Sequence, residues 1–169
     1  IHGRLAPEVF EEQVRAAGYF YASSSRDGLR QPALLAIEAN HSSGQTILRL
    51  LKKNRYSRLF AHRPLADRSE RAGPHLGWMT TSTTRMPMLD KLAQHIREDA
   101  VVIPCEASIR EMRTFVRGDD GKPQAQEGCH DDRVISLAIA LEMADRAYDE
   151  PRTKWQAPEY AVADTPTGL

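Results

Sequence analysis

Apolar residues fill one late stretch of the chain, Val134 to Ala144, almost without interruption. They include steps of three and four residues, with further apolar residues between them, so the pattern predicts a helix buried on most of its circumference. Two adjacent carboxylates, Asp131 and Asp132, come just before and are expected in its first turn, where the helix dipole favours anions. An N-terminal cap explains one aspartate well and the second poorly.

Shorter apolar runs alternate with helical patterns over the rest of the chain. The runs predict strands at 33–39, 57–61, 76–80 and 100–104, and polar turns around residues 118–121 predict a hairpin between 114–117 and 122–126. Helices are predicted at 7–17, 44–53, 85–97 and 106–112, with Ser42 or Ser43 capping the second and Thr83 or Thr84 the third. This alternation predicts an α/β fold, a mixed sheet with helices on both faces. Residues 1–148 form the expected domain, 62–75 a loop, and 149–169 a proline-bearing tail.

Composition excludes several classes of protein. With 169 residues, 41% of them hydrophobic and 27% charged, the chain is expected to fold as one globular domain. Lys plus Arg and Asp plus Glu both number 23, so net charge does not indicate a polyanion partner. The chain lacks phosphate-loop, dinucleotide-binding and nucleophile-elbow motifs, and no apolar run reaches membrane-spanning length. Cys105 and Cys129 match no common zinc spacing and are predicted to be buried thiols.

Three carboxylates remain as candidate chemistry. Glu38 ends the apolar run at 33–39, and open α/β sheets place ligands at the carboxyl ends of their strands. A charge facing water at the strand edge is an equally weighted interpretation. Together, the carboxylates of Glu38, Asp131 and Asp132 would offer a metal ion oxygen ligands only, which selects Mg²⁺ or Mn²⁺. Such two-metal sites activate water and stabilise the leaving oxygen of a phosphodiester. His130 is either a base or a side chain that orients one carboxylate.

Candidate phosphate contacts lie elsewhere in the sequence. The hydroxyl cluster Thr80 to Thr84, followed by Arg85 at a helix start, suits a phosphate oxygen, although a plain capping loop explains it more simply. Basic residues near a helix end have the same two interpretations, phosphate contact or solvated surface. The predicted DNA contacts are Thr84, Arg85, Lys91, Lys52 and Lys53.

Three segments, in this order, resemble a known family. They are LLAIEANHSSGQTILRLLKKNRYSRLF from Leu34, GWMTTSTTRMPMLDKL from Gly77, and EGCHDDRVISLAIAL from Glu127. Together they resemble the C-terminal nuclease domain of the large terminase subunit of tailed bacteriophages, which has an RNase H-like fold. The resemblance spans roughly residues 1–148. It implies a metal-dependent endonuclease that cuts concatemeric viral DNA during head packaging.

The resemblance also implies roles for particular residues and partners. Glu38, Asp131 and Asp132 would be the catalytic metal ligands for two Mg²⁺ or Mn²⁺ ions, with Asn40 and His130 orienting them. Double-stranded DNA would be the substrate. The protein would act in the host cytoplasm and would not bind a membrane. An ATPase motor domain would belong to the same subunit, with the portal and the small terminase subunit as further partners.

One part of the family pattern has no counterpart in this sequence. The first acidic motif, an aspartate on the opening strand of the sheet, is expected before the helix at Pro7, where only IHGRLA stands. We therefore expect a fragment that lacks one ligand and the first strands of the sheet, is weakly active or inactive, and exposes a sheet edge. The alternatives are a catalytically incomplete DNA-binding module of the same fold and a resolvase- or transposase-like nuclease.

Overall fold

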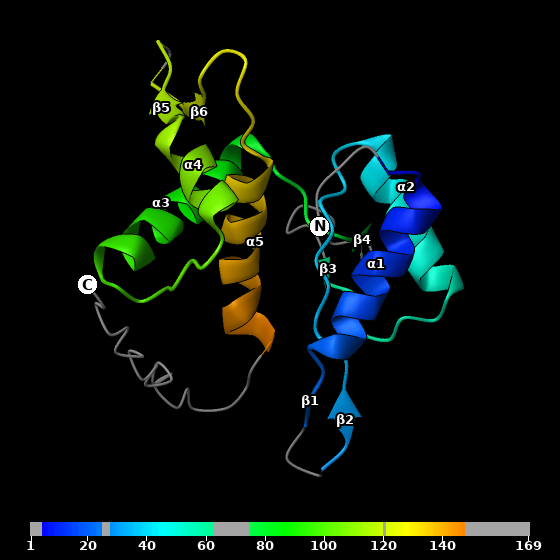
Figure 1. The fold of residues 1–169 in the computed structure, drawn as a ribbon. Helices are drawn as coiled ribbons and strands as arrows, with labels where there is room; N and C mark the ends of the chain where they lie inside the picture. The colour runs from blue at the N-terminus through cyan, green and yellow to red at the C-terminus, as the bar shows by residue number, and fades with distance from the viewer. Residues whose placement is uncertain (1–4, 25–27, 63–74, 120, 148–169) are drawn as a thin grey trace, which may run out of the picture.

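The computed structural model describes residues 5–24, 28–62, 75–119 and 121–147. These residues form five helices and three two-stranded antiparallel sheets, so the fold is mixed α/β (Figure 1). The elements in chain order are α1 (Pro7–Phe20), β1 (Ser23–Ser24), β2 (Arg30–Gln31), α2 (Ser42–Lys53), β3 (Ala61–His62), β4 (His75–Leu76), α3 (Ser82–Arg97), α4 (Glu106–Arg113), β5 (Phe115–Arg117), β6 (Pro123–Ala125) and α5 (Asp132–Ala147).

The extended segment 33–39 lies between two helical layers. Figure 1 shows α1 and α2 on one side of it and α3, α4 and α5 on the other. Its side chains alternate between two cores, as a strand requires. Leu35 and Ile37 pack with residues of α1 and α2, whereas Leu34 and Ala36 pack with residues of α3 and α5. Helices therefore cover both faces of the central segment.

The central segment pairs in parallel with two later segments of the chain. Isolated bridges join Leu35 to Leu59 and Glu38 to Trp78. The N–H of Trp78 donates to the carbonyl of Ile37 at 2.8 Å. The predicted strands at 33–39, 57–61 and 76–80 are therefore neighbours, although their regular pairing is short.

A glycine allows the third of these segments to turn. Residues 75 and 76 pair antiparallel with 61 and 62, whereas Trp78 pairs in parallel with Glu38. Gly77 lies between them with φ +88°, a left-handed conformation that favours glycine. A Cβ atom there would lie 2.7 Å from the carbonyl oxygen of Ile37. The residue thus provides both the bend and the close approach of two backbones.

Several predicted boundaries were wrong, and one predicted strand is missing. Residues 100–104 form no strand in the described chain, and Val102 is 64% exposed. Their β-branched side chains favour extended backbone, but a strand also needs a partner strand. α2 begins at Ser42 without a side-chain cap, so neither predicted serine caps it, and α3 begins at Ser82 after the cap Thr81.

Other predictions were confirmed or fall outside the described residues. The hairpin around 118–121 is present as β5 and β6, and α4 and α5 lie where their patterns predicted them. Among the helices of the described chain, none is long and apolar enough to cross a membrane. Most of the predicted loop, residues 63–74, and the predicted tail, 149–169, lie outside the described residues.

Candidate functional site

The acidic pair lies where the sequence predicted, at the start of α5. Asp132 is the first residue of the helix, and the carbonyl of Asp131 accepts the N–H of Ile135 at 2.9 Å. Asp131 is half-buried and Asp132 exposed. In the described contacts, the first N–H groups of α5 are not bonded by either aspartate side chain but by a residue from another helix. N-terminal capping therefore does not account for the pair.

That residue is Glu111 of α4, which the sequence did not single out. It is 8% exposed, and its Oε1 accepts the backbone N–H groups of Arg133 and Val134, the latter at 3.1 Å. Its Oε2 accepts from the Arg133 guanidinium at 3.1 Å. A buried carboxylate needs such partners, and the positive end of a helix dipole favours it. The one signal in the sequence is its position on the inner face of α4, next to Met112.

Arg85 connects the acidic pair to α3. Its guanidinium donates to Asp131 Oδ2 at 2.7 Å and reaches the carbonyl of Pro123 at 3.4 Å. Both charged side chains are about one-third exposed, at 30% and 32%. The contact joins the first turn of α3, the hairpin strand β6 and the approach to α5. The predicted DNA contact and a predicted metal ligand thus form an ion pair with each other.

Glu38 lies at the end of the central segment, as predicted, and its backbone has close contacts on two sides. It bridges Trp78 on one side, and its carbonyl oxygen lies against Gly44 in the first turn of α2, where a Cβ atom would have no room. The Glu38 side chain is half-buried. Two residues on, the Asn40 amide accepts the N–H of Thr80 at 2.8 Å and donates to the Thr80 carbonyl at 2.5 Å. Asn40 thus joins the strand end to the segment that leads into α3.

The hydroxyl cluster before Arg85 is largely used to start α3. Thr81 and Thr84 form a reciprocal capping box, in which the Thr84 hydroxyl accepts the Thr81 N–H at 2.8 Å. The same hydroxyl donates to the carbonyl of Met79 at 2.9 Å. The structure thus matches the capping interpretation of this cluster, and Thr84 has little hydrogen-bonding capacity left for a phosphate.

Three predicted lysine contacts lie away from this end of the molecule. Lys91 bonds Asp145 at 2.6 Å and the carbonyl of Leu141 at 3.2 Å, so it fastens α3 to α5. Lys52 and Lys53 are exposed in the last turn of α2, about 15 Å along the helix from its start near Glu38. His130, before the acidic pair, is exposed, and no hydrogen bond to it is seen within the described residues.

The donor chemistry of the carboxylates fits a hard divalent cation, but the three groups do not gather. Glu38, Asp131 and Asp132 offer oxygen atoms alone, which Mg²⁺ and Mn²⁺ prefer. Among the described residues, however, no group of three or more His, Cys, Asp or Glu side chains lies close enough to hold a metal ion. Two buried polar atoms between Glu38 and α3, Trp78 Nε1 and Thr80 Oγ1, lack partners in the described chain. An acceptor group from a ligand or solvent would satisfy the indole N–H.

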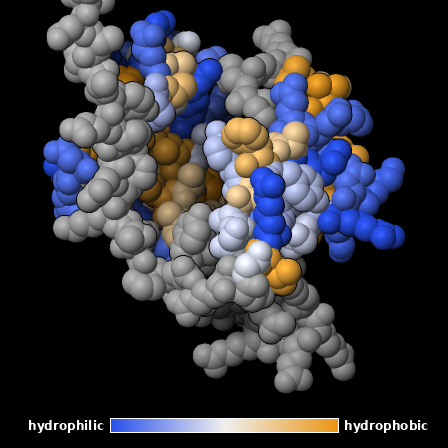
Figure 2. Space-filling model, turned by 60° about the horizontal axis from the view of Figure 1, so that its bottom comes forward, coloured by the Kyte–Doolittle hydropathy of each residue, from blue (hydrophilic) through white to orange (hydrophobic). Residues whose placement is uncertain are grey.

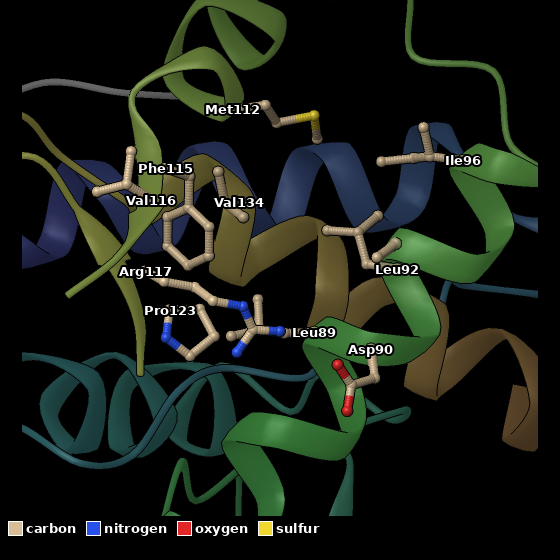
Figure 3. A pocket seen from close by; sticks show the side chains of 11 residues that line it. Leu89, Asp90, Leu92, Ile96, Met112, Phe115, Val116, Arg117, Pro123 and Val134 are labelled. Atoms are coloured by element: carbon tan, nitrogen blue, oxygen red, sulfur yellow. The ribbon is translucent and has the colours of Figure 1, made fainter. Parts of the chain in front are cut away.

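An apolar cavity lies beside the ion pair. It has a volume of about 290 Å³ and lies between α3, α4, the β5–β6 hairpin and α5 (Figure 3). Met112, Phe115 and Val134 line it, while Asp90 and Arg117 supply its charged groups. Such a lining does not suit a metal ion.

Both cysteines are exposed, so the prediction of buried thiols was wrong. Cys105 precedes the first residue of α4, and hydrogen bonds from the side chain and backbone of Ser108 lower the pKa of its thiol. Residues 100–105 form no strand, and the exposed Cys105 ends this stretch.

No family model, curated protein or solved structure matches this chain.

Proposed function

We propose that this chain is a metal-dependent endonuclease domain with an RNase H-like fold, related to the nuclease domain of viral DNA-packaging terminases. Its substrate is double-stranded DNA, and the residues that bind the metal ions are Glu38, Asp131 and Asp132. The order of the three resembling segments supports the relationship. So does the parallel pairing of the central segments between two helical layers.

One observation carries the proposal: a continuous series of contacts leads from Glu38 to the acidic pair. Glu38 bridges Trp78, and Asn40 beside it bonds Thr80. The chain then enters α3, whose Arg85 contacts Asp131 at the start of α5. In Figure 1 the first residues of α2, α3 and α5 lie toward the same end of the molecule. These contacts link the strand end at Glu38 to the start of α5, and open α/β sheets generally bind their ligands where the strands end.

The residues would divide the work as follows. Divalent ions bound there would activate water and stabilise the leaving oxygen of the phosphodiester. Glu38 and the aspartates would supply oxygen ligands to such ions, and Arg85 would contact a backbone phosphate. Asp131 and Arg85 must separate before both can act, because each is now the partner of the other.

The Arg85–Asp131 ion pair also favours a second function, that of a DNA-binding module that does not cleave. A pair at 2.7 Å keeps one oxygen of Asp131 away from a metal ion. Such a module would hold no metal ion, and Arg85 would bind DNA once a phosphate replaces Asp131 as its partner.

Cleavage of supercoiled plasmid in Mg²⁺ or Mn²⁺ separates the two functions. The nuclease predicts nicking that disappears in Glu38→Ala and in the double variant Asp131→Ala/Asp132→Ala. The matched control is Glu12→Ala, which removes an exposed carboxylate from α1. Retarded migration of DNA without nicking, retained in the acidic variants, would reject the nuclease and support the binding module.

A further inference from the structure

Hydrophobic surface gathers in a hollow near the middle of the face shown in Figure 2, and the cavity beside α3 is also apolar. Another cavity, of about 370 Å³, has a different lining. It lies beside the β3–β4 pair, and two histidines, His62 and His75, contribute to its walls. Gln45 and Met79 add an amide and a thioether, and none of its described lining residues carries a carboxylate. The donor atoms of this cavity are therefore nitrogen, sulfur and uncharged oxygen.

The two histidines face each other across the β3–β4 pair. His62 and His75 are directly opposite in the antiparallel register, so their side chains leave the same face of the two strands. The centres of the two rings lie 6.1 Å apart, and the ring planes are inclined at 37°. A metal ion holds each imidazole nitrogen at about 2.0–2.1 Å, which places the centres of two rings on one ion roughly 5–6 Å apart. The observed separation therefore needs only a small rotation of either ring.

The ring of His62 is held in an orientation that suits a metal ligand. Its Nδ1 donates to the carbonyl of Gly77 at 3.2 Å, because a carbonyl oxygen can only accept. In a neutral imidazole, this bond makes Nε2 the nitrogen that carries the lone pair. Phe60 stacks against the ring, with centres 6.2 Å apart and planes inclined at 12°. Histidines that bind metal ions generally donate their other ring nitrogen to a carbonyl or carboxylate in this way.

His75 supplies the second nitrogen. It is the first residue of β4 and is exposed, and no hydrogen bond to it is seen in the part of the chain that the structure describes. Its ring can therefore turn toward His62 without breaking such a bond.

We propose that His62 and His75 bind one late transition-metal ion, such as Zn²⁺, across β3 and β4. Imidazole nitrogen suits Zn²⁺, Ni²⁺ and Cu²⁺, whereas Mg²⁺ and Ca²⁺ prefer carboxylate and carbonyl oxygen. The described residues supply a pair of nitrogen ligands rather than a group of three, so water completes the coordination. This inference is independent of the proposed nuclease activity, because the ligands of the nuclease are carboxylates elsewhere in the fold.

The ion would fasten a short part of the fold. β3 and β4 contain two residues each. Directly after β4, Gly77 turns the chain toward Trp78, which bridges Glu38 at the end of the central segment. An ion that binds the folded chain but not the unfolded chain stabilises the fold as its concentration rises. Zn²⁺ should therefore raise the Tm of the chain.

Titration of the metal-free intact chain with Zn²⁺ tests the proposal, with the NMR signals of the histidine rings as the measurement. The signals of His62 and His75 should shift together and fit one Kd, because one ion binds both rings. An equal concentration of Mg²⁺ should leave both signals unchanged, since imidazole is a poor ligand for that ion.

Single substitutions separate a bound ion from a simple contact between two rings. His62→Gln and His75→Gln should each raise the Kd for Zn²⁺ at least about tenfold, since even an outer partner of a metal ligand contributes that much. His95→Gln is the matched control and should leave this Kd unchanged. His95 is also half-buried, and its Nδ1 bonds a carbonyl, that of Lys91, at 2.9 Å.

Protection of the Gly77 amide from hydrogen exchange checks that β3 and β4 remain folded in each variant, because this amide donates to the carbonyl of Phe60 at 2.8 Å. A shift of one ring without the other, or a His62 signal that keeps its Kd in His75→Gln, would overturn the proposal. Zn²⁺ that shifts other histidines alone, such as His130, or shifts none, would overturn it as well.

Discussion

The guanidinium of Arg85 and the carboxylate of Asp131 lie 2.7 Å apart, although 46 residues separate them in the sequence. Each has been assigned a different partner in the proposed function, Arg85 a phosphate and Asp131 a metal ion. The ion pair therefore competes with both ligands. Because the two side chains are about one-third exposed, it is weak enough to be broken, on the order of 1 kcal/mol or less.

Removal of the negative charge from Asp131 should strengthen DNA binding. In Asp131→Asn the Arg85 guanidinium loses its anionic competitor and is available to a phosphate. The gain expected from a partly exposed pair is about two- to fivefold in Kd. Fluorescence anisotropy with a labelled duplex in EDTA measures it without cleavage. A Kd equal to or higher than that of the unsubstituted chain would show that Arg85 does not contact DNA.

Loss of Arg85 should have the opposite effect and a distinct salt signature. Each phosphate contact contributes about one unit to the slope of log Kd against log salt concentration, so Arg85→Ala should flatten the slope by about one. Lys53→Ala is the control, because this lysine lies at the far end of α2 and its loss should leave the slope unchanged. The reverse ranking of the two variants would place the DNA on α2 instead.

The local pattern of the sequence predicted much of the fold but little of the site. Helices were predicted because apolar residues at steps of three and four define one buried face. The prediction of a strand at 100–104 was wrong because β-branched residues favour an extended backbone but do not supply a neighbouring strand. The pairing of Arg85 with Asp131 and the capping of α5 by Glu111 depend on contacts between distant segments. Periodicity in one segment carries no information about them.

Glu111 should be important for the stability of the α5 start. Glu111→Ala leaves two backbone N–H groups and the Arg133 guanidinium without their acceptor, which should cost about 2–3 kcal/mol in the free energy of unfolding. Glu111→Gln keeps one acceptor oxygen and should cost less. Glu106→Ala removes an exposed ion pair on the same helix and should lower the free energy of unfolding by about 0.5 kcal/mol or less. Urea denaturation measures all three, and equal losses for the two alanine variants would contradict the capping role.

Tyr56 should make stability fall at alkaline pH. Burial, and then the neighbouring Tyr19, raise the pKa of its hydroxyl, while Arg58 opposes them. Because the folded pKa is the higher one, the contribution is present below the unfolded pKa of about 10 and is lost as pH rises through the folded value.

Tyr56→Phe removes this titration together with the 2.6 Å hydrogen bond to the carbonyl of Ala33. It should cost about 1 kcal/mol at neutral pH, and the difference should shrink above pH about 10. Thermal denaturation of both proteins from neutral to alkaline pH measures this. A constant difference across that range would show that the tyrosine does not titrate with unfolding.

Direct binding of Mn²⁺, followed by electron paramagnetic resonance, tests whether the three carboxylates act together. If they do, the unsubstituted chain binds Mn²⁺, and Glu38→Ala and Asp131→Ala/Asp132→Ala each weaken binding at least about tenfold, since each removes an anionic ligand. Glu12→Ala leaves the affinity unchanged. An affinity in Glu38→Ala equal to that of the unsubstituted chain would show that the strand end and the helix start do not share an ion.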